Sequence, residues 1–510
     1  MAFNSDVSTL FIVVLTDVQM TRTFMTRRIA ALSLAFLLAS GGASLRAQSA
    51  DSLLQGAFWR TQGLRIMEAW TRKAQTNDGL FYAELDRQWA PSDTTTVYPG
   101  MLARHLFSYS VAYLMRGNDA HLQRAERILD FLITHGWDEK YGGWYNAVTR
   151  TGTVVDADKD LFMQIYATTG LALYYVATRD ERARTYLQRS RQFMDEHAWD
   201  EAHGGYVDVL RRNGSVKKSV KDFSPQLAPL SGYLLYLYPA TRDSMYLHKA
   251  ERIMELTLTH MQGDRGWIRE RFARDWTFLP NDSKNSHLNV GHNAEVAWLL
   301  LRLHALTGNE RYRRKGLALT DKLLRHAFHE DTGAWLHKLK RTDPSQHPDE
   351  TVWWVQAYGN MLQLYAYRTT GEERYLEAFR KGARFWNEAF VDDEYGGTVL
   401  KTTLDGTVTA GDKAVRTKTS YHALEHALLS SLYLDLWANG DSTSLHYRFQ
   451  NPQGEPLHPL PVEDTPRIHQ VLVNGAPQTP PDTSDGTLRL PSRPGSIRLE
   501  IDMTSGPRTP

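Results

Sequence analysis

Two histidines are the first residues of this sequence whose types and spacing point to chemistry. His292 and Glu295 stand at positions i and i+3 of the segment GHNAEVAWLLL, so they share one face of a helix. A carboxylate placed there can hold the proton of one ring nitrogen and leave the other nitrogen free to act as a base. His422, in the segment TSYHALEHALL, is a second imidazole on a different helix. Together they predict proton transfer with a bound molecule, and a buried histidine that only bonds a helix neighbour is the alternative for each one alone.

An arginine and a tryptophan pair interrupt two further apolar segments. Arg104, in MLARHLF, is placed either to stabilise an oxygen that becomes anionic during a reaction or to pair with an acid on a neighbouring helix. Trp353 and Trp354, in ETVWWVQAYGN, are adjacent and therefore point in different directions, so one of them should face a cavity. Gln356 follows in the same segment. Imidazoles and an arginine among aromatic rings suit a neutral, polyhydroxylated ligand.

A zinc-binding pattern overlaps the second histidine. The run His422-Ala-Leu-Glu425-His426 matches the HxxEH motif of inverted zinc proteases, with two imidazoles at i and i+4. The motif is short in a chain with 19 histidines, and no evident helix with a third ligand follows it. We therefore expect no metal site.

Paired acids are a more serious rival, because glycoside hydrolases use two carboxylates. Asp158 and Asp160 stand at the start of an apolar segment and leave this alternative open. Asp392 and Asp393 occupy a turn position that other repeats fill with Asp-Glu, so we expect them to be solvated loop charges.

These residues lie in a repeating framework. Turns that contain glycine recur 61 to 67 residues apart, and one glycine from each of the six turns is Gly79, Gly143, Gly205, Gly266, Gly333 and Gly397. A second series of turns, such as RGND and TGNE, lies between them. Two turns in about 63 residues leave room for two helices of roughly 18–20 residues, so each unit is predicted to be a helical hairpin.

The two helices of a hairpin differ in character. Segments such as 161–178 and 353–369 are apolar nearly all round, which is typical of buried helices, whereas 181–198 and 372–390 have one charged face. Six helices of each kind predict an all-α fold, an (α/α)6 barrel of six helical hairpins within residues 51–440. An open solenoid of helix pairs is the alternative. The candidate residues fall in the N-terminal halves of inner helices that run in one direction, so we expect them to gather at one mouth of the barrel.

Composition limits the partners. The 510 residues carry a formal net charge of +1, which favours neither a nucleic acid nor a membrane surface. There is no cysteine, which excludes disulfides, thiol nucleophiles and cysteine-ligated metals. Histidine is left to carry the chemistry, with a small carbohydrate as the expected partner.

The two ends of the chain differ from the repeats. Residues 1–47 contain a signal-peptide pattern that starts at Met25, in which two arginines precede a short apolar run and small residues. No cysteine follows that could carry a lipid anchor, so we expect a periplasmic or secreted protein with no membrane contact beyond export. Residues 441–510 contain short alternating runs separated by Pro and Gly, which predict a small β appendage.

With these motifs in place, the WDxxxGG turns, Arg104, GHNAEVAWLL, WWVQA and KTSYH together resemble the N-acylglucosamine 2-epimerase superfamily over residues 55–440. The resemblance implies a sugar epimerase or isomerase that moves the C2 proton of a reducing sugar through an enediolate without a cofactor. It implies that His292 and His422 are acid and base, that Glu295 is the partner of His292, and that Arg104 holds a sugar oxygen.

The resemblance also implies a set of substrate contacts. Trp298 and Trp354 are implied as aromatic contacts of the sugar. With the residues that we add to them, the expected substrate-binding set is Trp298, Trp353, Trp354, Gln356, Tyr358, Asp160 and Gln226. The expected assembly is a monomer or a homodimer.

Three departures from the family pattern leave the substrate and the outcome, epimerisation or isomerisation, open. Ser224 and Ala228 stand where relatives have Asn and His, Tyr358 replaces an acid, and Glu425 replaces an arginine. A glycan hydrolase or lyase that uses Asp158 and Asp160 or Tyr358, and a non-catalytic carbohydrate-binding barrel, remain the alternative functions.

Overall fold

The structure is a computed structural model that describes residues 50–76, 78–449, 456–458, 462–463, 466–479, 487–489 and 495–503. By its contacts the chain divides into the units Met1–Ser52 and Leu53–Pro510, and the elements discussed below belong to the second unit. The predicted signal peptide at residues 1–47 lies outside the described residues. Among the described helices, none combines the length and the hydropathy needed to cross a membrane.

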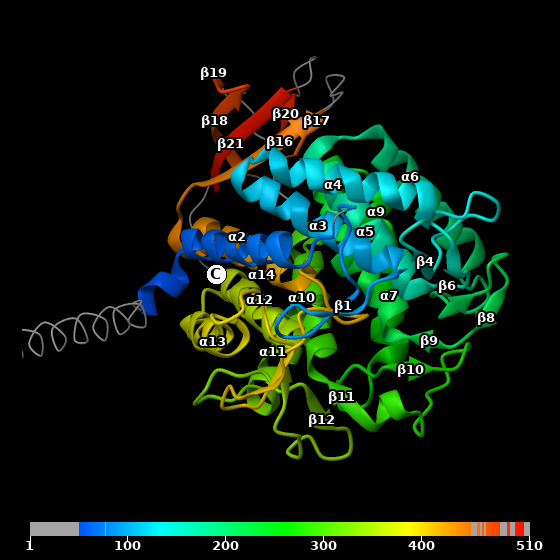
Figure 1. Cartoon of the computed structure of the whole chain (residues 1–510). Coiled ribbons are helices and arrows are strands. Elements are labelled where there is room, and N and C mark those ends of the chain that lie inside the picture. Colours follow the sequence, from blue (N-terminus) through cyan, green and yellow to red (C-terminus); the bar gives the residue numbers. More distant parts are fainter. Residues whose placement is uncertain are drawn as a thin grey trace, which may run out of the picture. The chain divides into compact units, whose positions relative to one another are not determined.

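Long helices alternate between an inner and an outer ring (Figure 1). The inner ring consists of α3 (Pro99–Arg116), α5 (Leu161–Thr178), α7 (Phe223–Pro229) with α8 (Leu235–Thr241), α10 (Val290–Thr307), α12 (Trp353–Thr370) and α14 (Tyr421–Tyr433). The outer ring consists of α2 (Gly56–Lys73), α4 (Asp119–Phe131), α6 (Glu181–His197), α9 (Ser244–Leu256), α11 (Glu310–Ala327) and α13 (Glu373–Phe385). Each inner helix packs against the next, and α14 packs against α3, so the ring is closed. The predicted (α/α)6 barrel is confirmed, and the open solenoid is excluded.

The second series of turns sets where one helix ends and the next begins. Gly117 and Arg179 end α3 and α5 in the left-handed conformation, with φ of 71° and 54°. Asn118 and Asp180 then cap α4 and α6, because their side-chain oxygens accept hydrogen bonds from the first free N–H groups. A left-handed residue followed by Asn or Asp therefore links each of these inner helices to its outer partner.

The third inner helix is interrupted. Pro229 ends α7, and a π-helical turn at Leu230–Leu234 separates it from α8, in which Pro239 stands. Proline lacks an N–H and clashes with the preceding helical turn, so two prolines within about ten residues prevent one regular helix here.

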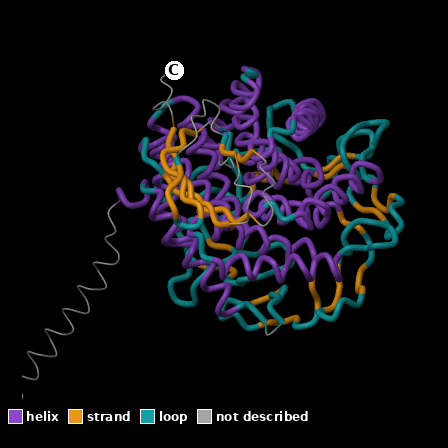
Figure 2. The backbone as a smooth tube through the Cα atoms, turned by 90° about the horizontal axis from the view of Figure 1, so that it is seen from above, coloured by secondary structure: helices purple, strands orange, loops and turns teal. Residues whose placement is uncertain are grey.

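Short strands lie at the end of the barrel where the inner helices begin, and Figure 2 shows them along the edge of the helices, apart from the C-terminal sheet. These strands are β1 (Glu84–Leu85), β2 (Pro91–Asp93), β3 (Thr96–Val97), β4 (Ala147–Thr149), β5 (Val154–Asp156), β6 (Lys159–Asp160), β7 (Val209–Leu210), β8 (Val216–Lys218), β9 (Lys221–Asp222), β10 (Arg271–Phe272), β11 (His287–Asn289), β12 (Lys338–Lys340), β13 (Thr351–Val352), β14 (Lys401–Thr402) and β15 (Val408–Ala410). They form antiparallel pairs and three-stranded sheets. Five of them, β3, β6, β9, β11 and β13, lead directly into inner helices, so this rim sets where those helices start.

The C-terminal tail forms a four-stranded antiparallel sheet in the order β16-β21-β18-β19 and a separate β17-β20 pair. The strands are β16 (Thr443–Phe449), β17 (Pro456–Leu457), β18 (Pro466–Val473), β19 (Ala476–Gln478), β20 (Leu488–Arg489) and β21 (Gly495–Met503). Strand β16 packs against α3 and α5, and its His446 lies beside Gly117 at the C-terminal end of α3. The sheet therefore covers the end of the barrel opposite the rim strands.

Candidate active site

The first candidate histidine is held from the rim. His292 lies in the first turn of α10, and its Nδ1 is 2.8 Å from Oε2 of Glu270, which stands in the loop before β10. Glu295, the predicted partner of His292, stands one turn further along α10 beside Ser231 and Glu425; its charge acts on His292, but the hydrogen bond to Nδ1 comes from Glu270. Burial alone would lower the pKa of His292, but the Glu270 carboxylate raises it above its usual value.

The second candidate histidine lies in a different environment. His422, in the first turn of α14, is surrounded by Tyr421, Tyr358 and Trp354, whose ring centroids are 4.7, 5.5 and 6.2 Å from its own. Its Nδ1 is 3.7 Å from Oε2 of Glu425, which is too far for a hydrogen bond. Burial, and then the nearby Arg104 guanidinium, hold the pKa of His422 well below its usual value.

Both imidazoles face the same space. The centroid of the His292 ring is 5.2 Å from that of Trp354, the indole that also borders His422. Phe223 stacks on the other side of His292 at 3.9 Å. Trp354 is partly exposed, and the side chain of His292 is 19% exposed, so this space is open to solvent. Of the two adjacent tryptophans, Trp354 is therefore the one that lies between the histidines.

Arg104 borders the same space from α3. Its guanidinium lies 3.5 Å above the Tyr166 ring, and Nη1 donates a hydrogen bond to the Thr417 carbonyl at 2.7 Å. Within the described part of the chain Arg104 has no carboxylate partner, and its Nε has no hydrogen-bond partner. The ion pair considered as its alternative role is absent there, so the guanidinium can bind an oxygen of a ligand.

Two carboxyl groups lie below the histidines. Glu425 is fully buried, and its Oε1 accepts hydrogen bonds from the hydroxyls of Tyr236 at 2.9 Å and Tyr421 at 3.0 Å. Burial raises the pKa of Glu425 to about 7, and Glu295 adds to this effect. Burial likewise raises the pKa of Glu295. The pair therefore shares less than two negative charges at neutral pH.

The remaining predicted aromatic residues lie around or beneath this pair. Tyr358 is buried between His422 and Trp298, and its ring is 5.7 Å from Trp298. Trp298 is completely buried and packs under the Arg302 guanidinium at 4.5 Å. Trp353 is buried behind His422, with ring centroids 6.0 Å apart. Tyr358 and Trp353 contact His422, whereas Trp298 lies beneath the histidines. With Glu295 and Glu425 it forms the floor of the site.

The two glutamines predicted to bind substrate bind the backbone instead. The amide of Gln226 accepts from the N–H and donates to the C=O of Tyr206, at 2.9 and 2.8 Å. The amide of Gln356 accepts from the Trp335 N–H and donates to the carbonyls of Gly333 and Gly382, each at 2.9 Å. Gln164 and Asn293 make the same contacts with Trp144 and Ile268. Buried backbone groups of each turn need such partners, so Gln226 and Gln356 are structural.

The aspartates of the rival pattern have structural partners. Asp160 caps α5 by accepting from the Phe162 N–H at 3.0 Å, and burial raises its pKa. Asp158 forms an ion pair with Lys217. Asp392 is buried between Lys413 and Arg87, so the expectation of a solvated charge was wrong for it, whereas Asp393 is exposed. The cap uses one carboxylate oxygen of Asp160, and the other oxygen can still contact a ligand. Asp160 therefore stays a predicted substrate contact.

The zinc-protease pattern is not assembled. His426 lies between the inner and the outer helices of the barrel. Its ring centroid is 4.6 Å from that of Trp59 and 4.8 Å from that of Trp386, and its Nε2 is 3.4 Å from Nδ2 of Asn360. His422 contacts other aromatic residues, as described above, so the two histidines of the motif do not share one environment. Among the described residues, no group of three or more His, Asp or Glu side chains is arranged to hold a metal ion.

Glu270 is the main residue that sequence reasoning missed. The amides of four inner helices bond Trp144, Tyr206, Ile268 and Trp335, which mark equivalent turn positions in successive repeats, and the residues two positions after these four are Asn146, Asp208, Glu270 and His337. Asn146 accepts from the N–H at the start of α5 and His337 bonds Glu350, so this position faces the rim in each unit. Aligning the repeats would have placed Glu270 beside the start of α10.

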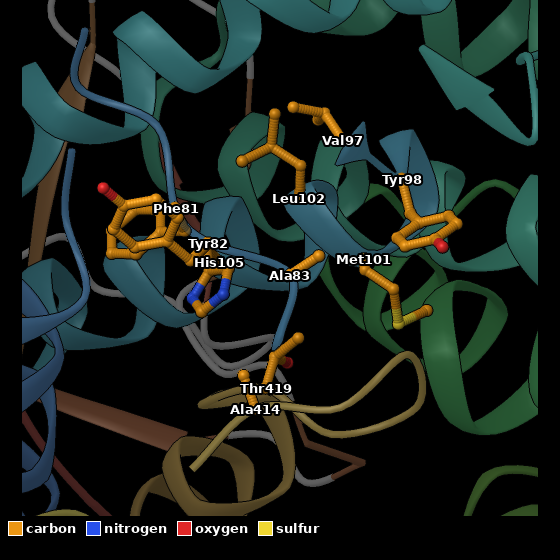
Figure 3. Close-up of a pocket in the computed structure, with 10 residues that line it drawn as sticks. All are labelled: Phe81, Tyr82, Ala83, Val97, Tyr98, Met101, Leu102, His105, Ala414 and Thr419. Atoms are coloured by element: carbon orange, nitrogen blue, oxygen red, sulfur yellow. The ribbon is translucent and has the colours of Figure 1, made fainter. Parts of the chain in front are cut away.

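A small pocket on the other side of α3 is separate from this site (Figure 3). Its volume is about 20 Å³, roughly enough for one water molecule, and Phe81, Met101, His105 and Thr419 are among its lining residues. His105 stacks on Phe81 at 4.2 Å, and burial lowers its pKa to about 3. This neutral imidazole belongs to the core.

The closed (α/α)6 barrel, with two imidazoles around Trp354 at its mouth and Arg104 beside the second of them, places the protein among the barrel enzymes that act on carbohydrates. The N-acylglucosamine 2-epimerase family matches residues 79–426 of this chain. The chain belongs to that family.

Individual relatives extend the comparison. Cellobiose 2-epimerase of Bacteroides fragilis is 25% identical over 390 residues, which cover 73% of this chain and 97% of the relative. D-mannose isomerase of Thermobifida fusca is 24% identical over 233 residues, 44% of this chain and 56% of the relative. The solved structure of cellobiose 2-epimerase from Spirochaeta thermophila superposes with a TM-score of 0.66 at 25% identity, and covers 73% of this chain and 94% of that one.

Proposed function

We propose that this protein interconverts reducing sugars by moving the proton at C2, either as a 2-epimerase or as an aldose–ketose isomerase. The observation that carries the proposal is the pair of imidazoles around Trp354, whose pKa values are shifted in opposite directions. Groups with separated pKa values can act as acid and base at the same pH.

In this proposal, the environment of each histidine favours one direction of proton transfer. His422, kept neutral by burial and by Arg104, takes the C2 proton of the open-chain aldose as its C2–H bond breaks. The electron pair moves to the carbonyl oxygen, where the Arg104 guanidinium stabilises the enediolate. His292, whose protonated form is favoured by Glu270, returns a proton.

The position that receives the proton decides the product. Protonation of C2 on the opposite face gives the 2-epimer. Protonation of C1, with transfer of the O2 proton to O1, gives the ketose. The named relatives include both an epimerase and an isomerase. Ala228 is buried, and its methyl group offers the sugar no polar contact at the position where the resemblance implies a histidine.

Incubation in heavy water tests the proposal. We expect deuterium at C2 of at least one reducing mono- or disaccharide, and loss of this label by at least a thousandfold in His292→Asn and His422→Asn variants with unchanged circular dichroism. New reducing ends from a polysaccharide, made by a His422→Asn variant, would instead support a hydrolase. Saturable sugar binding without label would support a binding protein.

We also propose that the chain is exported and processed near Ala47, as the signal-peptide pattern predicts, and that it acts as a monomer or a homodimer. N-terminal sequencing of protein recovered from the periplasm or medium tests the first point, and light scattering tests the second. Recovery of chains that retain Met25 in the cytoplasm would contradict export.

A further inference from the structure

The C-terminal tail places a carboxylate inside the barrel. Glu463 is buried, and its Oε1 lies 2.5 Å from Nε of Arg302, which is also buried and comes from the C-terminal half of α10. The Tyr365 hydroxyl donates to the other carboxylate oxygen at 3.0 Å. Two charges with no exposed surface are costly to bury unless they are paired, so this contact is a specific one.

Arg302 connects the tail to the floor of the candidate site. On α10, His292, Glu295, Trp298 and Arg302 are spaced by three or four residues, so they lie on one face that runs from the mouth to the opposite end. The Arg302 guanidinium is 5.5 Å from the ring of Tyr236, and the hydroxyl of Tyr236 donates to Glu425. The contacts thus run from Glu463 through Arg302 and Tyr236 to Glu425.

Glu425 is placed to control the second histidine. Its Oε1 is occupied by two tyrosine hydroxyls, whereas Oε2 has no hydrogen-bond partner among the described residues and lies 3.7 Å from the equally unpartnered Nδ1 of His422. A small movement closes this gap. If Glu425 is ionised, it holds the proton on Nδ1 and leaves Nε2 of His422 as a base. If Glu425 is protonated, it donates to Nδ1, and Nε2 then carries the proton.

We infer that Glu463 is a positioning residue that acts through Arg302 to set the pH at which Glu425 ionises, and with it the pH at which His422 becomes a base. With Glu463 in place, the charge of Arg302 is neutralised locally and gives Glu425 little help to ionise. Without it, a buried cation beneath the floor would favour the Glu425 anion. This inference rests on the proposed function of His422.

Other charged and titratable groups face Glu425 from each neighbouring helix. Their charges are expected to stay the same when Glu463 is replaced. They are Tyr166 on α5, Tyr236 on α8, Glu295 and Arg302 on α10, Tyr358 on α12, and Tyr421 and His422 on α14; Arg104 on α3 acts on His422. Of these, Arg302 is the one that contacts the tail. Burial raises the pKa of Glu425 to about 7, in the range where a change beneath the floor alters its ionisation.

The experiment uses the full chain with Glu463→Gln. The pH titration of the His422 ring is followed by nitrogen NMR, in which the signals of Nδ1–H and Nε2–H tautomers differ, and His422→Asn assigns the resonance. We expect the tautomer change to move to lower pH by about 1 unit, as expected for an unpaired charge acting over several ångströms in protein. The pH at which C2 deuterium exchange rises should move by the same amount, with little change in KM.

A charge-free double variant separates electrostatics from folding. Arg302→Met with Glu463→Leu removes both charges, so the midpoint should return close to that of the wild type even if thermal stability changes. Tyr365→Phe removes a contact of Glu463 but no charge, and should leave the midpoint in place. An unchanged midpoint in Glu463→Gln, or an equal shift in the double variant, would overturn the inference. The NMR readout needs no substrate, so the inference and the proposed function can fail separately.

Discussion

At the scale of single residues, the pKa values of the two histidines shift in opposite directions, and each histidine has a different contact with its nearest carboxylate. His292 has a full hydrogen bond to Glu270 from the rim, whereas His422 has a longer contact with Glu425 in the floor. The Glu270 bond fixes which nitrogen of His292 carries a proton and stabilises the imidazolium. Glu425 stands close enough to influence His422 but leaves it neutral.

Glu270→Gln tests the role of the rim carboxylate. Because Glu270 raises the pKa of His292, its removal should lower that pKa, so the pH limb governed by the His292 imidazolium should move to lower pH. The rate of C2 exchange at neutral pH should fall by about 10- to 100-fold, the usual effect of removing a residue that orients a catalytic group. The pH profile of kcat/KM in heavy and light water is the measurement.

Glu350→Gln is a matched control, since Glu350 bonds His337 at the equivalent position of the next repeat. It should leave both the rate and the pH profile unchanged. Equal losses in the two variants would mean that Glu270 serves only to stabilise the rim.

At the scale of elements, four of the six rim turns are each attached to the following inner helix by one amide side chain. This contact explains why amide side chains recur on the inner helices at Gln164, Gln226, Asn293 and Gln356. Their position in the N-terminal halves of inner helices resembles that of the catalytic candidates. In sequence, a residue that bonds a turn and a residue that bonds a ligand therefore look alike.

Replacing these amides distinguishes the two roles. Gln226→Met and Gln356→Met should lower the free energy of unfolding by roughly 2–4 kcal/mol, because buried backbone groups of the turn lose their partners. Gln164→Met, at an amide that was not predicted to bind substrate, should show the same loss. Urea unfolding measures the stability, and KM of the best substrate should stay within about twofold in all three. A large rise in KM confined to Gln226→Met or Gln356→Met would restore a substrate role.

The helices could be predicted because the sequence patterns that indicate them lie within each helix and the turn that follows it. Apolar composition identified inner helices such as α5 and α12, and the left-handed residue with its Asn or Asp cap repeats at a fixed interval. The direction of a side chain such as Gln356, and the identity of the carboxylate that reaches His292, depend on loops that pack from a neighbouring repeat. Periodicity within one helix carries no information about that packing.

At the scale of the whole molecule, a repeated ion triad ties the second and third turns to later parts of the chain. Asp138 bonds Lys159 and Arg212, and Asp200 bonds Lys221 and Arg274, so the lysine is 21 and the arginine 74 residues further on in both. The sixth turn has no later repeat to supply its arginine.

The first part of the barrel supplies that arginine instead. Asp392 lies 2.6 Å from Lys413, again 21 residues further on, and 3.0 Å from Arg87, which precedes the first inner helix. The triad that elsewhere joins successive repeats here joins the two ends of the ring. The expectation of a solvated Asp392 failed because a partner 305 residues away in sequence is invisible to a local reading.

Ring closure should therefore make the barrel sensitive to acid. Burial alone would raise the pKa of Asp392, but hydrogen bonds from Arg87 and Lys413 lower it to about 2, and Asp138 is lowered to about 2 by its own partners. A carboxylate whose pKa is depressed in the folded state contributes stability above the unfolded value near 4 and loses it as the pH falls toward 2. Urea midpoints should consequently drop steeply between about pH 4 and pH 2.

Asp392→Asn isolates the contribution of closure to this behaviour. It leaves the buried Lys413 without an anion, so the free energy of unfolding at neutral pH should fall by about 3 kcal/mol, and the acid dependence should become shallower. Asp393→Asn, at the exposed neighbouring position, should change neither quantity by more than about 0.5 kcal/mol. If Asp392→Asn were as stable as Asp393→Asn, contacts of helices α14 and α3 alone would hold the ring closed, and the ion triad would serve only to shape the sixth turn.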